Sequence, residues 1–497
     1  MNSERARQQR LCLASLSAHC FVALIIMNGF ITSKAVAQRR QSIGTTKSDN
    51  ASSQREDVAA LLREAATLLQ TGKPDEAEPL LRRALSSAPT NADAHNLLGA
   101  ALDQKGQTQA AEREYSEALR LNPRAVSARA NLGVLLARTG RVDEAAKMFE
   151  SVLRDVPEHP QATLNLGLLY VARGDYSRAV TLLERANEQH PNTFPVLFNL
   201  GVAFYELKQF DKAESALHSA SALAPDNPET LYYLGLIEDA RGENERAAEV
   251  FEKALTIRPN FTEANFMLGE MLRKSGRAAS AREYYEKALE QEPSKLVYYI
   301  RLGGDYMLLD LYDQALQIFE RAVARFPNVA EAHYFVGIAA RGRAAYDVAE
   351  AALKKSLALK PENADALAQL GFIVGEQGRY NEAEELLRHA LKLNDKHFYA
   401  NYDLGRLLVK TRRYEEAIPI LQRGIQLKPK NASVHYQLFM AFSRLKRKEE
   451  AEKELTLFKQ FEEERKKRGR DDDDAQNVGN DDRPGNASQP VEPPKNQ

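Results

Sequence analysis

Glycine, alanine and a large apolar residue recur along this chain at a constant spacing of 34 residues. An alanine follows each repeated glycine after twelve residues, a large apolar residue follows each alanine after four, and proline follows most of the glycines after 24. A period of this length indicates a repeat protein and argues against a single globular core. The repeated glycines are Gly99, Gly133, Gly167, Gly201, Gly235, Gly269, Gly303, Gly337, Gly371 and Gly405.

Each unit of the repeat predicts two amphipathic helices. In the unit that begins at Pro160, apolar residues follow helical spacing on both sides of Gly174. Pro160 suits a first helical turn, where no intrahelical bond is lost, and Pro191 ends the second helix. Gly174 suits a left-handed helix end before the next helix starts. The small residues Gly167 and Ala179 are expected where the two helices of one hairpin cross closely.

The pattern resembles the tetratricopeptide repeat over residues 58–465. The resemblance rests on the unit length, on alanine in the second helix, on the terminal proline and on Leu-Gly in the first helix, as in Leu166-Gly167 and Leu200-Gly201. It implies an all-α fold, a right-handed superhelical solenoid of about twelve helix-turn-helix repeats. It also implies that the first helices line a concave groove and that the partners are proteins or peptides.

The first 37 residues have the pattern of a secretion signal. Basic residues up to Arg10 precede an apolar stretch from Leu11 to Ile31, and Ala-Val-Ala ends the segment at Ala37. This pattern predicts a cleaved signal peptide at 1–37 and a periplasmic or secreted protein. The alternative is an uncleaved membrane anchor, because the apolar span is long enough to cross a bilayer.

The segments on either side of the array are polar and lack its periodicity. Residues 38–57 are predicted to be a disordered linker, and residues 466–497 a charged disordered tail. The twelve units therefore occupy 58–465.

Composition excludes several classes of function. The formal charge of −1 gives no basic excess to neutralise phosphates, so no nucleic-acid partner is expected. Both cysteines, Cys12 and Cys20, lie in the signal-like segment, and no two of the nine histidines have metal-ligand spacing. The sequence has no phosphate loop and no nucleophile elbow. We therefore expect no enzyme activity, no catalytic residues, no metal and no cofactor.

The family resemblance places groove-facing side chains at positions 2, 5, 6, 9, 12 and 13 of each unit. Position 6 is asparagine in three consecutive units, as Asn131, Asn165 and Asn199. This series resembles the asparagine ladder in the groove of O-linked N-acetylglucosamine transferases. An amide side chain both donates and accepts, so it can pair with any peptide unit. The alternative is that these amides only satisfy local backbone groups.

Beyond Asn199 the projected groove becomes aromatic. Aromatic anchors in a concave wall are common hot spots for a bound peptide. The alternative is that several of these side chains point into the core between helices. The candidate peptide-binding residues in this part are Phe198, Tyr205, Tyr232, Tyr233, Phe266, Met267 and Arg301.

These features predict a scaffold or adaptor that binds peptide segments of partner proteins, in assembly of envelope or secretion machinery. One alternative is a self-assembling structural protein that forms homo-oligomers. Another is an accessory subunit that presents substrate to a separate glycan-handling enzyme. Contact with a membrane is expected only if the N-terminal segment stays uncleaved.

Overall fold

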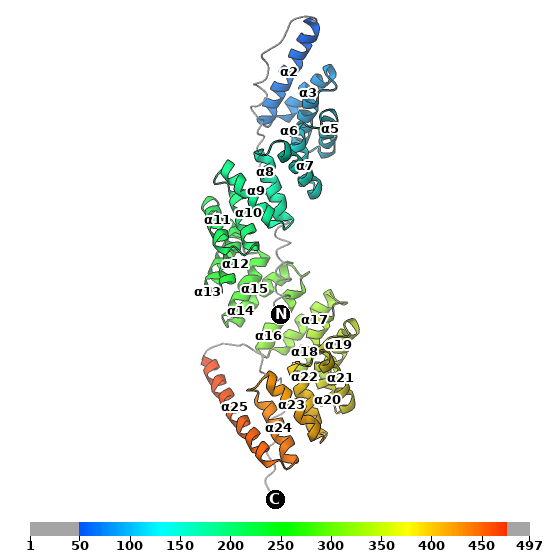
Figure 1. Cartoon of the computed structure of the whole chain (residues 1–497), viewed down its shortest axis with the longest axis vertical. Helices are drawn as coiled ribbons and strands as arrows, with labels where there is room; N and C mark the ends of the chain where they lie inside the picture. Colours follow the sequence, from blue (N-terminus) through cyan, green and yellow to red (C-terminus); the bar gives the residue numbers. More distant parts are fainter. Residues whose placement is uncertain (1–48, 475–497) are drawn as a thin grey trace. The chain divides into compact units, whose positions relative to one another are not determined.

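The computed structural model describes residues 49–474, and all regular secondary structure in this range is α-helical (Figure 1). The chain divides into two compact units, Met1–Ile237 and Glu238–Gln497. The predicted signal peptide lies outside the described residues, as do most of the predicted linker and tail. Within residues 49–474, no helix has the length and apolar character needed to span a membrane.

In the first unit, consecutive helices pack in pairs as hairpins, and each hairpin packs against the next. The α12 helix contains the boundary between the units. The helices of this unit are α2 (Asp49–Gln70), α3 (Pro74–Ser87), α4 (Ala92–Gln104), α5 (Thr108–Leu121), α6 (Val126–Arg138), α7 (Val142–Asp155), α8 (Pro160–Ala172), α9 (Tyr176–Gln189), α10 (Phe194–Glu206), α11 (Phe210–Leu223) and α12 (Pro228–Arg241).

The second unit continues the same hairpin arrangement, from α14 with α15 to α24 with α25. The helices of this unit are α13 (Asn244–Ile257), α14 (Thr262–Lys274), α15 (Ala278–Gln291), α16 (Leu296–Leu308), α17 (Tyr312–Arg325), α18 (Ala330–Gly342), α19 (Tyr346–Leu359), α20 (Ala364–Glu376), α21 (Tyr380–Leu393), α22 (Phe398–Lys410), α23 (Tyr414–Leu427), α24 (Ala432–Arg444) and α25 (Lys448–Asp474).

The repeated glycine of each first helix lies against the large apolar residue of the second. A Cβ atom added to Gly167 would lie 2.9 Å from Leu183 Cδ2, and one added to Gly201 would lie 2.5 Å from Leu217 Cγ. Ala179 is fully buried. The close crossing predicted for these small residues is confirmed, because a larger side chain there would force the helices apart.

The turn inside each hairpin has a residue with positive φ. At Gly174, φ is 74°, as predicted for a left-handed helix end. The next backbone N–H, that of Asp175, donates to Tyr170 O at 2.8 Å and satisfies a carbonyl of the last turn. Five units have a non-glycine residue with positive φ at the equivalent place, namely Lys208, Asp310, Ala344, Arg412 and Lys446.

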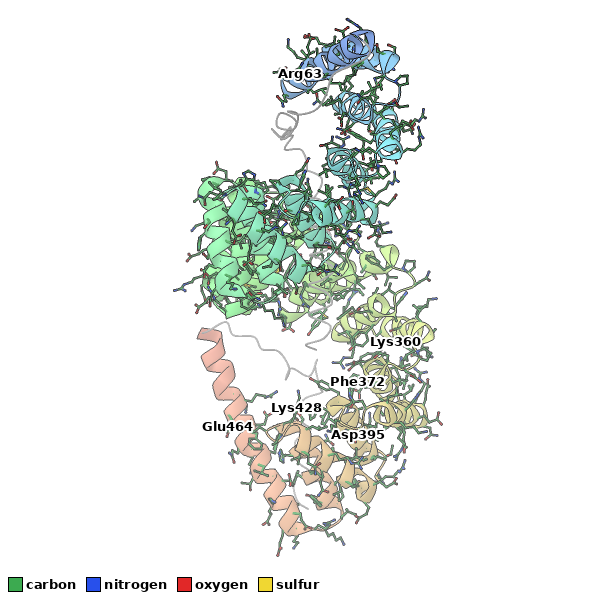
Figure 2. The ribbon with its side chains drawn as sticks, turned by 45° about the horizontal axis from the view of Figure 1, so that its top comes forward. Arg63, Lys360, Phe372, Asp395, Lys428 and Glu464 are labelled. Atoms are coloured by element: carbon green, nitrogen blue, oxygen red, sulfur yellow. The ribbon has the colours of Figure 1, made fainter. Side chains whose placement is uncertain are left out.

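The terminal helices are longer than the repeat pattern predicts. The α2 helix begins at Asp49 instead of residue 58, and no glycine or proline between them would end it. The α25 helix continues to Asp474, past residue 465, where the repeat pattern predicts its end. Glu464, labelled in Figure 2 on the extended part of α25, forms an ion pair with Lys430 at 3.6 Å.

Candidate functional site

First helices of consecutive repeats contact one another within each unit. These contacts join α4, α6, α8 and α10 in the first unit, and α16, α18, α20, α22 and α24 in the second. Within each unit, side chains at the same position of successive first helices therefore lie on one face, which we call the first-helix face of that unit. The candidate residues are judged by their position on this face.

The three predicted asparagines are all half-buried on the first-helix face. Asn131 Nδ2 donates to Asn96 Oδ1 of the preceding repeat at 3.1 Å. Asn199 Nδ2 donates to Pro195 O of its own helix at 2.8 Å. Among the side chains that the structure describes, in residues 57–466, none forms a hydrogen bond with the Asn165 side chain, and no described donor reaches Oδ1 of the three asparagines. Two of the three therefore donate locally, while all three retain an open carbonyl acceptor.

The aromatic part of the predicted groove is mostly core. Phe198, Tyr232 and Tyr233 keep 3%, 2% and 4% of their exposure. The ring centroids of Phe198 and Tyr233 are 5.8 Å apart, and those of Tyr232 and Tyr233 are 5.7 Å apart. This burial corrects the prediction that these three rings contact a ligand, because almost none of their surface is accessible. Tyr205, 5.9 Å from Tyr233, is half-buried and keeps a partly accessible ring.

Phe266 and Met267 are also engaged in packing. The Phe266 ring is half-buried, with its centroid 5.0 Å from that of Tyr298 and 5.7 Å from that of Tyr285. Met267 is 9% exposed. Only the outer part of Phe266 is left for a partner, so the sequence analysis overstated the accessible aromatic surface at these positions.

Arg301 belongs to a buried polar network on α14, α15 and α16. Its Nε donates to Glu270 Oε1 at 2.8 Å, and the Tyr285 hydroxyl donates to the same oxygen at 2.5 Å. Arg273 Nη2 lies 3.4 Å from Glu270 Oε2. Burial raises the pKa of Glu270, but the Arg301 and Arg273 guanidinium groups outweigh it and hold that pKa below its ordinary value. Arg301 therefore shares its counter-charge, Glu270, with Arg273 inside the fold.

Asp305 lies in the same part of α16 and is 1% exposed. Its Oδ2 has no hydrogen-bond partner among the residues that the structure describes. Burial raises the pKa of this carboxyl to about 7, although the nearby arginines oppose the shift. Asp305 is thus an ionisable group whose charged form the fold disfavours.

A second polar group, on α18, α20 and α22, includes residues that the sequence analysis did not select as binding residues. Phe372 lies between two arginines, with Arg341 Cζ 4.9 Å and Arg406 Cζ 5.0 Å from its ring centroid. Arg406 pairs with Glu376 at 2.9 Å. Phe372 and Glu376 hold positions 9 and 13 of their unit, two of the positions that the family resemblance places in the groove.

The described part of the chain contains no cluster of histidine, cysteine, aspartate and glutamate suited to hold a metal ion. The chemistry that the first-helix face offers is hydrogen bonding by amides in the first unit, and ionic and aromatic contacts in the second.

Two family models match the sequence. The model described as "Cilia and flagella-associated protein 70 C-terminal domain" matches residues 122–258 and 238–477. The model described as "Tetratricopeptide repeat" matches residues 68–132. Together the matches extend over nearly the whole helical array. The chain therefore belongs to the tetratricopeptide repeat family, and the all-α repeat fold predicted from its sequence is confirmed.

No curated protein matches the chain. Among solved structures, YrrB, described as "a TPR protein with an unusual peptide-binding site", is 24% identical over 37% of this chain and 95% of its own, with a TM-score of 0.35. A tetratricopeptide repeat protein from Parabacteroides merdae is 20% identical over 50% of this chain and 98% of its own, with a TM-score of 0.35. The Cut9–Hcn1 complex is 14% identical over 83% of this chain and 96% of its own chain, with a TM-score of 0.42.

Proposed function

We propose that this protein is an adaptor that binds extended segments of partner proteins along its first-helix face. Its family is one of protein-interaction scaffolds. The observation that carries the finer proposal is the series Asn131, Asn165 and Asn199, which repeats at the same position of consecutive first helices with open carbonyl oxygens.

The spacing of the series suits an extended backbone. Neighbouring helices pack about 8 to 10 Å apart, and an extended chain in the polyproline II conformation advances about 3.1 Å per residue with three residues per turn. Successive asparagines would therefore meet every third residue of a bound segment. Each Oδ1 would accept a backbone N–H of that segment, whatever its side chain is.

This mode of binding predicts modest affinity and tolerance of sequence. A net hydrogen bond contributes about 0.5 to 1.5 kcal/mol, so three of them discriminate weakly among peptides. The partly exposed Tyr205 ring, on the same helix as Asn199, adds an apolar contact at one end of the series. Simultaneous contacts with several repeats would supply the remaining affinity.

The test is binding of a library of unstructured, end-blocked peptides to the full-length protein and to a triple variant with Asn131, Asn165 and Asn199 replaced by alanine. The matched control replaces Lys147, Thr181 and Ser215 by alanine. These control residues are exposed on the second helices of the same three repeats. The proposal predicts that the asparagine variant loses most of the bound peptides and that the control keeps them.

N-methylation of a selected peptide sharpens this test. Methylating every third backbone nitrogen removes the hydrogen atoms that the asparagines would accept, while the side chains stay unchanged. Weaker binding in only one of the three methylation registers supports the ladder. Equal binding by all registers, or equal binding by the asparagine variant and the wild type, would disprove it.

We also propose that the protein acts outside the cytoplasm, in assembly of envelope or secretion machinery. The support is the succession of basic, apolar and small residues in 1–37. N-terminal sequencing of the protein purified from its native host tests this. A start at Gln38 supports export with cleavage, and a start at Met1 or Asn2 contradicts cleavage.

A further inference from the structure

Three consecutive first helices of the second unit carry a cationic and aromatic stack. Arg341 on α18 and Arg406 on α22 both place their guanidinium groups against the ring of Phe372 on α20, at 4.9 and 5.0 Å from its centroid. Such cation–π contacts fix flexible side chains and leave the charges available to other partners. Lys410, one turn beyond Arg406, lies 5.3 Å from the Tyr380 ring centroid.

The charges of this group do not balance. Arg406 is paired with Glu376 at 2.9 Å and with Asp403 at 3.7 Å. Arg341 donates to the amide oxygen of Gln369. No carboxylate among the described side chains of residues 57–466 forms an ion pair with Arg341 or with the exposed Lys410. Three cations thus face two carboxylates, which leaves one positive charge in excess.

One of the two carboxylates, Asp403, is partly protonated near pH 6 because its charged form is disfavoured. Asp403 is 7% exposed. Burial raises its pKa to about 6, against the opposing effect of Arg406 and Arg341. The excess positive charge therefore grows as the pH falls toward 6.

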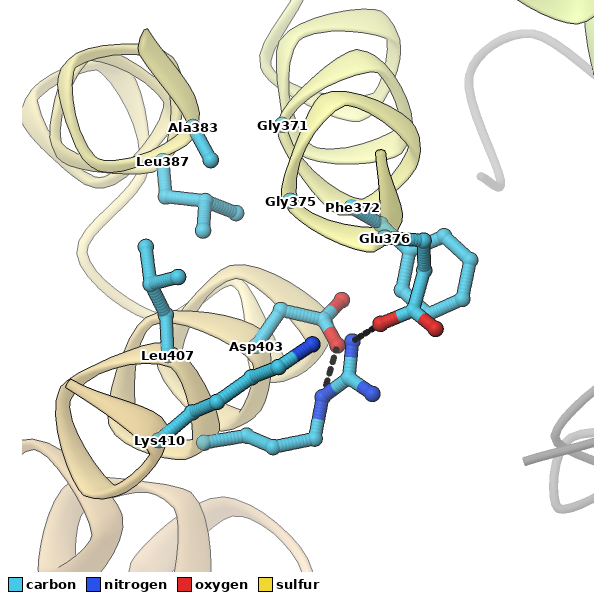
Figure 3. A pocket seen from close by; sticks show the side chains of 10 residues that line it. Gly371, Phe372, Gly375, Glu376, Ala383, Leu387, Asp403, Leu407 and Lys410 are labelled. Carbon is cyan, nitrogen blue, oxygen red and sulfur yellow. Dashed lines mark ion pairs between the residues drawn. The ribbon is translucent and has the colours of Figure 1, made fainter. Parts of the chain in front are cut away.

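A small hollow opens beside this group, as Figure 3 shows. It exists because Gly375 has no side chain: a Cβ atom there would meet only Ala383 Cβ, at 3.4 Å. The apolar walls are Ala383, Leu387 and Leu407. Glu376, Asp403, Arg406 and Lys410 form its polar border.

We propose that this hollow and its cations form a second binding site on the first-helix face, which takes an acidic residue of a partner segment with a small apolar neighbour. Lys410 binds the carboxylate at the polar border of the hollow, and the charge of Arg341 beside Phe372 attracts it. The small side chain enters the space beside Gly375. A single carboxylate fits better than a polyphosphate chain, because Glu376 and Asp403 repel any further negative charge. The site involves no asparagine of the first unit, so its test is independent of the test of the proposed asparagine ladder.

The experiment measures fluorescence anisotropy of a labelled ten-residue peptide of alternating glutamate and alanine, with both ends blocked. The comparison peptide has glutamine in place of glutamate. The full-length protein is tested as wild type, as the variant Arg341→Gln with Lys410→Gln, and as a control variant, Lys355→Gln with Arg423→Gln. The control residues are exposed on the second helices of the same two repeats, and they remove the same charge.

The site predicts that the glutamate peptide binds the wild type and that its affinity falls about tenfold in the test variant, the usual scale for removing charged contacts. The control variant should change it less than about twofold. The single variant Lys410→Gln, at an exposed residue, keeps the test valid if the double variant unfolds, and should lose about threefold.

The proposal is wrong if the wild type fails to bind the glutamate peptide or if the glutamine peptide binds equally well. It is also wrong if the control variant loses as much affinity as the test variant. A single-stranded oligonucleotide of ten residues is added as a competitor. If it displaces the peptide at lower concentration than unlabelled peptide does, the site recognises phosphate and the assignment to an acidic side chain is wrong.

Discussion

His435 and Glu454 form a buried contact between the last two helices, with Nδ1 2.6 Å from Glu454 Oε2. The other ring nitrogen, Nε2, lies 2.9 Å from Pro429 O in the preceding turn. Both oxygens accept hydrogen bonds, so the ring satisfies both contacts only when both nitrogens carry protons. His435 thus joins α24, α25 and the turn before them as an imidazolium.

This contact predicts a pH-dependent C-terminal repeat. Burial disfavours the charge, but Glu454 and Pro429 O outweigh it, so the pKa of His435 lies above its ordinary value. Protonated His435 therefore stabilises the folded state. This stabilisation is fully present below the unfolded pKa of about 6.5 and is lost as the pH rises through the folded pKa. Hydrogen exchange of α24 should therefore accelerate as the pH rises above about 6.5, after correction for intrinsic rates. His435→Gln should remove this pH dependence; if it persists unchanged, the assignment is wrong.

Two adjacent glycines of α16 should respond in opposite ways to alanine. A Cβ atom on Gly303 would overlap the Phe319 ring, whereas one on Gly304 meets no atom within 4 Å. Gly304→Ala should stabilise the protein by about 0.5 to 1 kcal/mol through helix propensity. Gly303→Ala should destabilise it by about 1 to 3 kcal/mol through overpacking. Chemical denaturation followed by circular dichroism measures both; a change of the same sign in the two variants contradicts the packing.

The turns of two neighbouring hairpins offer a reciprocal test of left-handed strain. Ala344 has φ of 63°, and the equivalent Gly378 has φ of 84° with no atom within 4 Å of an added Cβ. Ala344→Gly should stabilise by about 1 kcal/mol, and Gly378→Ala should destabilise by a similar amount. Thermal unfolding of each variant and of the double variant measures these two changes in stability. A double variant far from wild-type stability would show that the turns are not equivalent.

The two buried carboxyls of the Arg301 network should differ in their response to amide substitution. Because the pKa of Asp305 is raised to about 7, its stability contribution is present below about pH 4 and is lost as the pH rises toward 7. Asp305→Asn should therefore stabilise the protein at pH 8, on the order of 1 to 3 kcal/mol, and change little at pH 4.

Glu270 provides the matched comparison for that substitution. Its pKa is lowered, and its carboxylate accepts hydrogen bonds from Arg273, Arg301 and Tyr285. Glu270→Gln should destabilise at pH 8, because it leaves two guanidinium groups without their counter-charge. Denaturation curves at both pH values measure the pair. Destabilisation by Asp305→Asn at pH 8 would contradict the network as described.

The hairpin core followed directly from the sequence. Gly201 and Leu217 lie 16 residues apart, and that spacing brings a missing side chain against a large one in every regular unit. The ends of the array did not follow, because the repeat pattern was extended to 58 and 465 without asking what would end the helices there. Proline alone does not mark these ends, because α21 ends at Leu393 although Asp395 replaces the proline of that unit, whereas α25 passes Glu463.

The candidate site was predictable only in part. The family resemblance predicted a groove-facing position 6 for Asn131 and Asn165, and Asn131 does donate to Asn96 of the preceding first helix. The same rule failed for Phe198 and Tyr233, because a repeat position says nothing of how much space large neighbours fill. The ring centroids of Phe198 and Tyr233 lie 5.8 Å apart, and both side chains are buried in the core.

The central claim, that partners bind along the first-helix face, is tested most directly by site-specific photo-cross-linking of the full-length protein. A photoreactive phenylalanine derivative replaces Asn165 in one variant and the exposed Thr181 of the same repeat in another. Both are irradiated with the same end-blocked peptide library, and cross-linked peptides are counted by mass spectrometry. The account predicts abundant adducts at position 165 and few at 181. Equal adducts at both positions, or adducts at 181 alone, would contradict it.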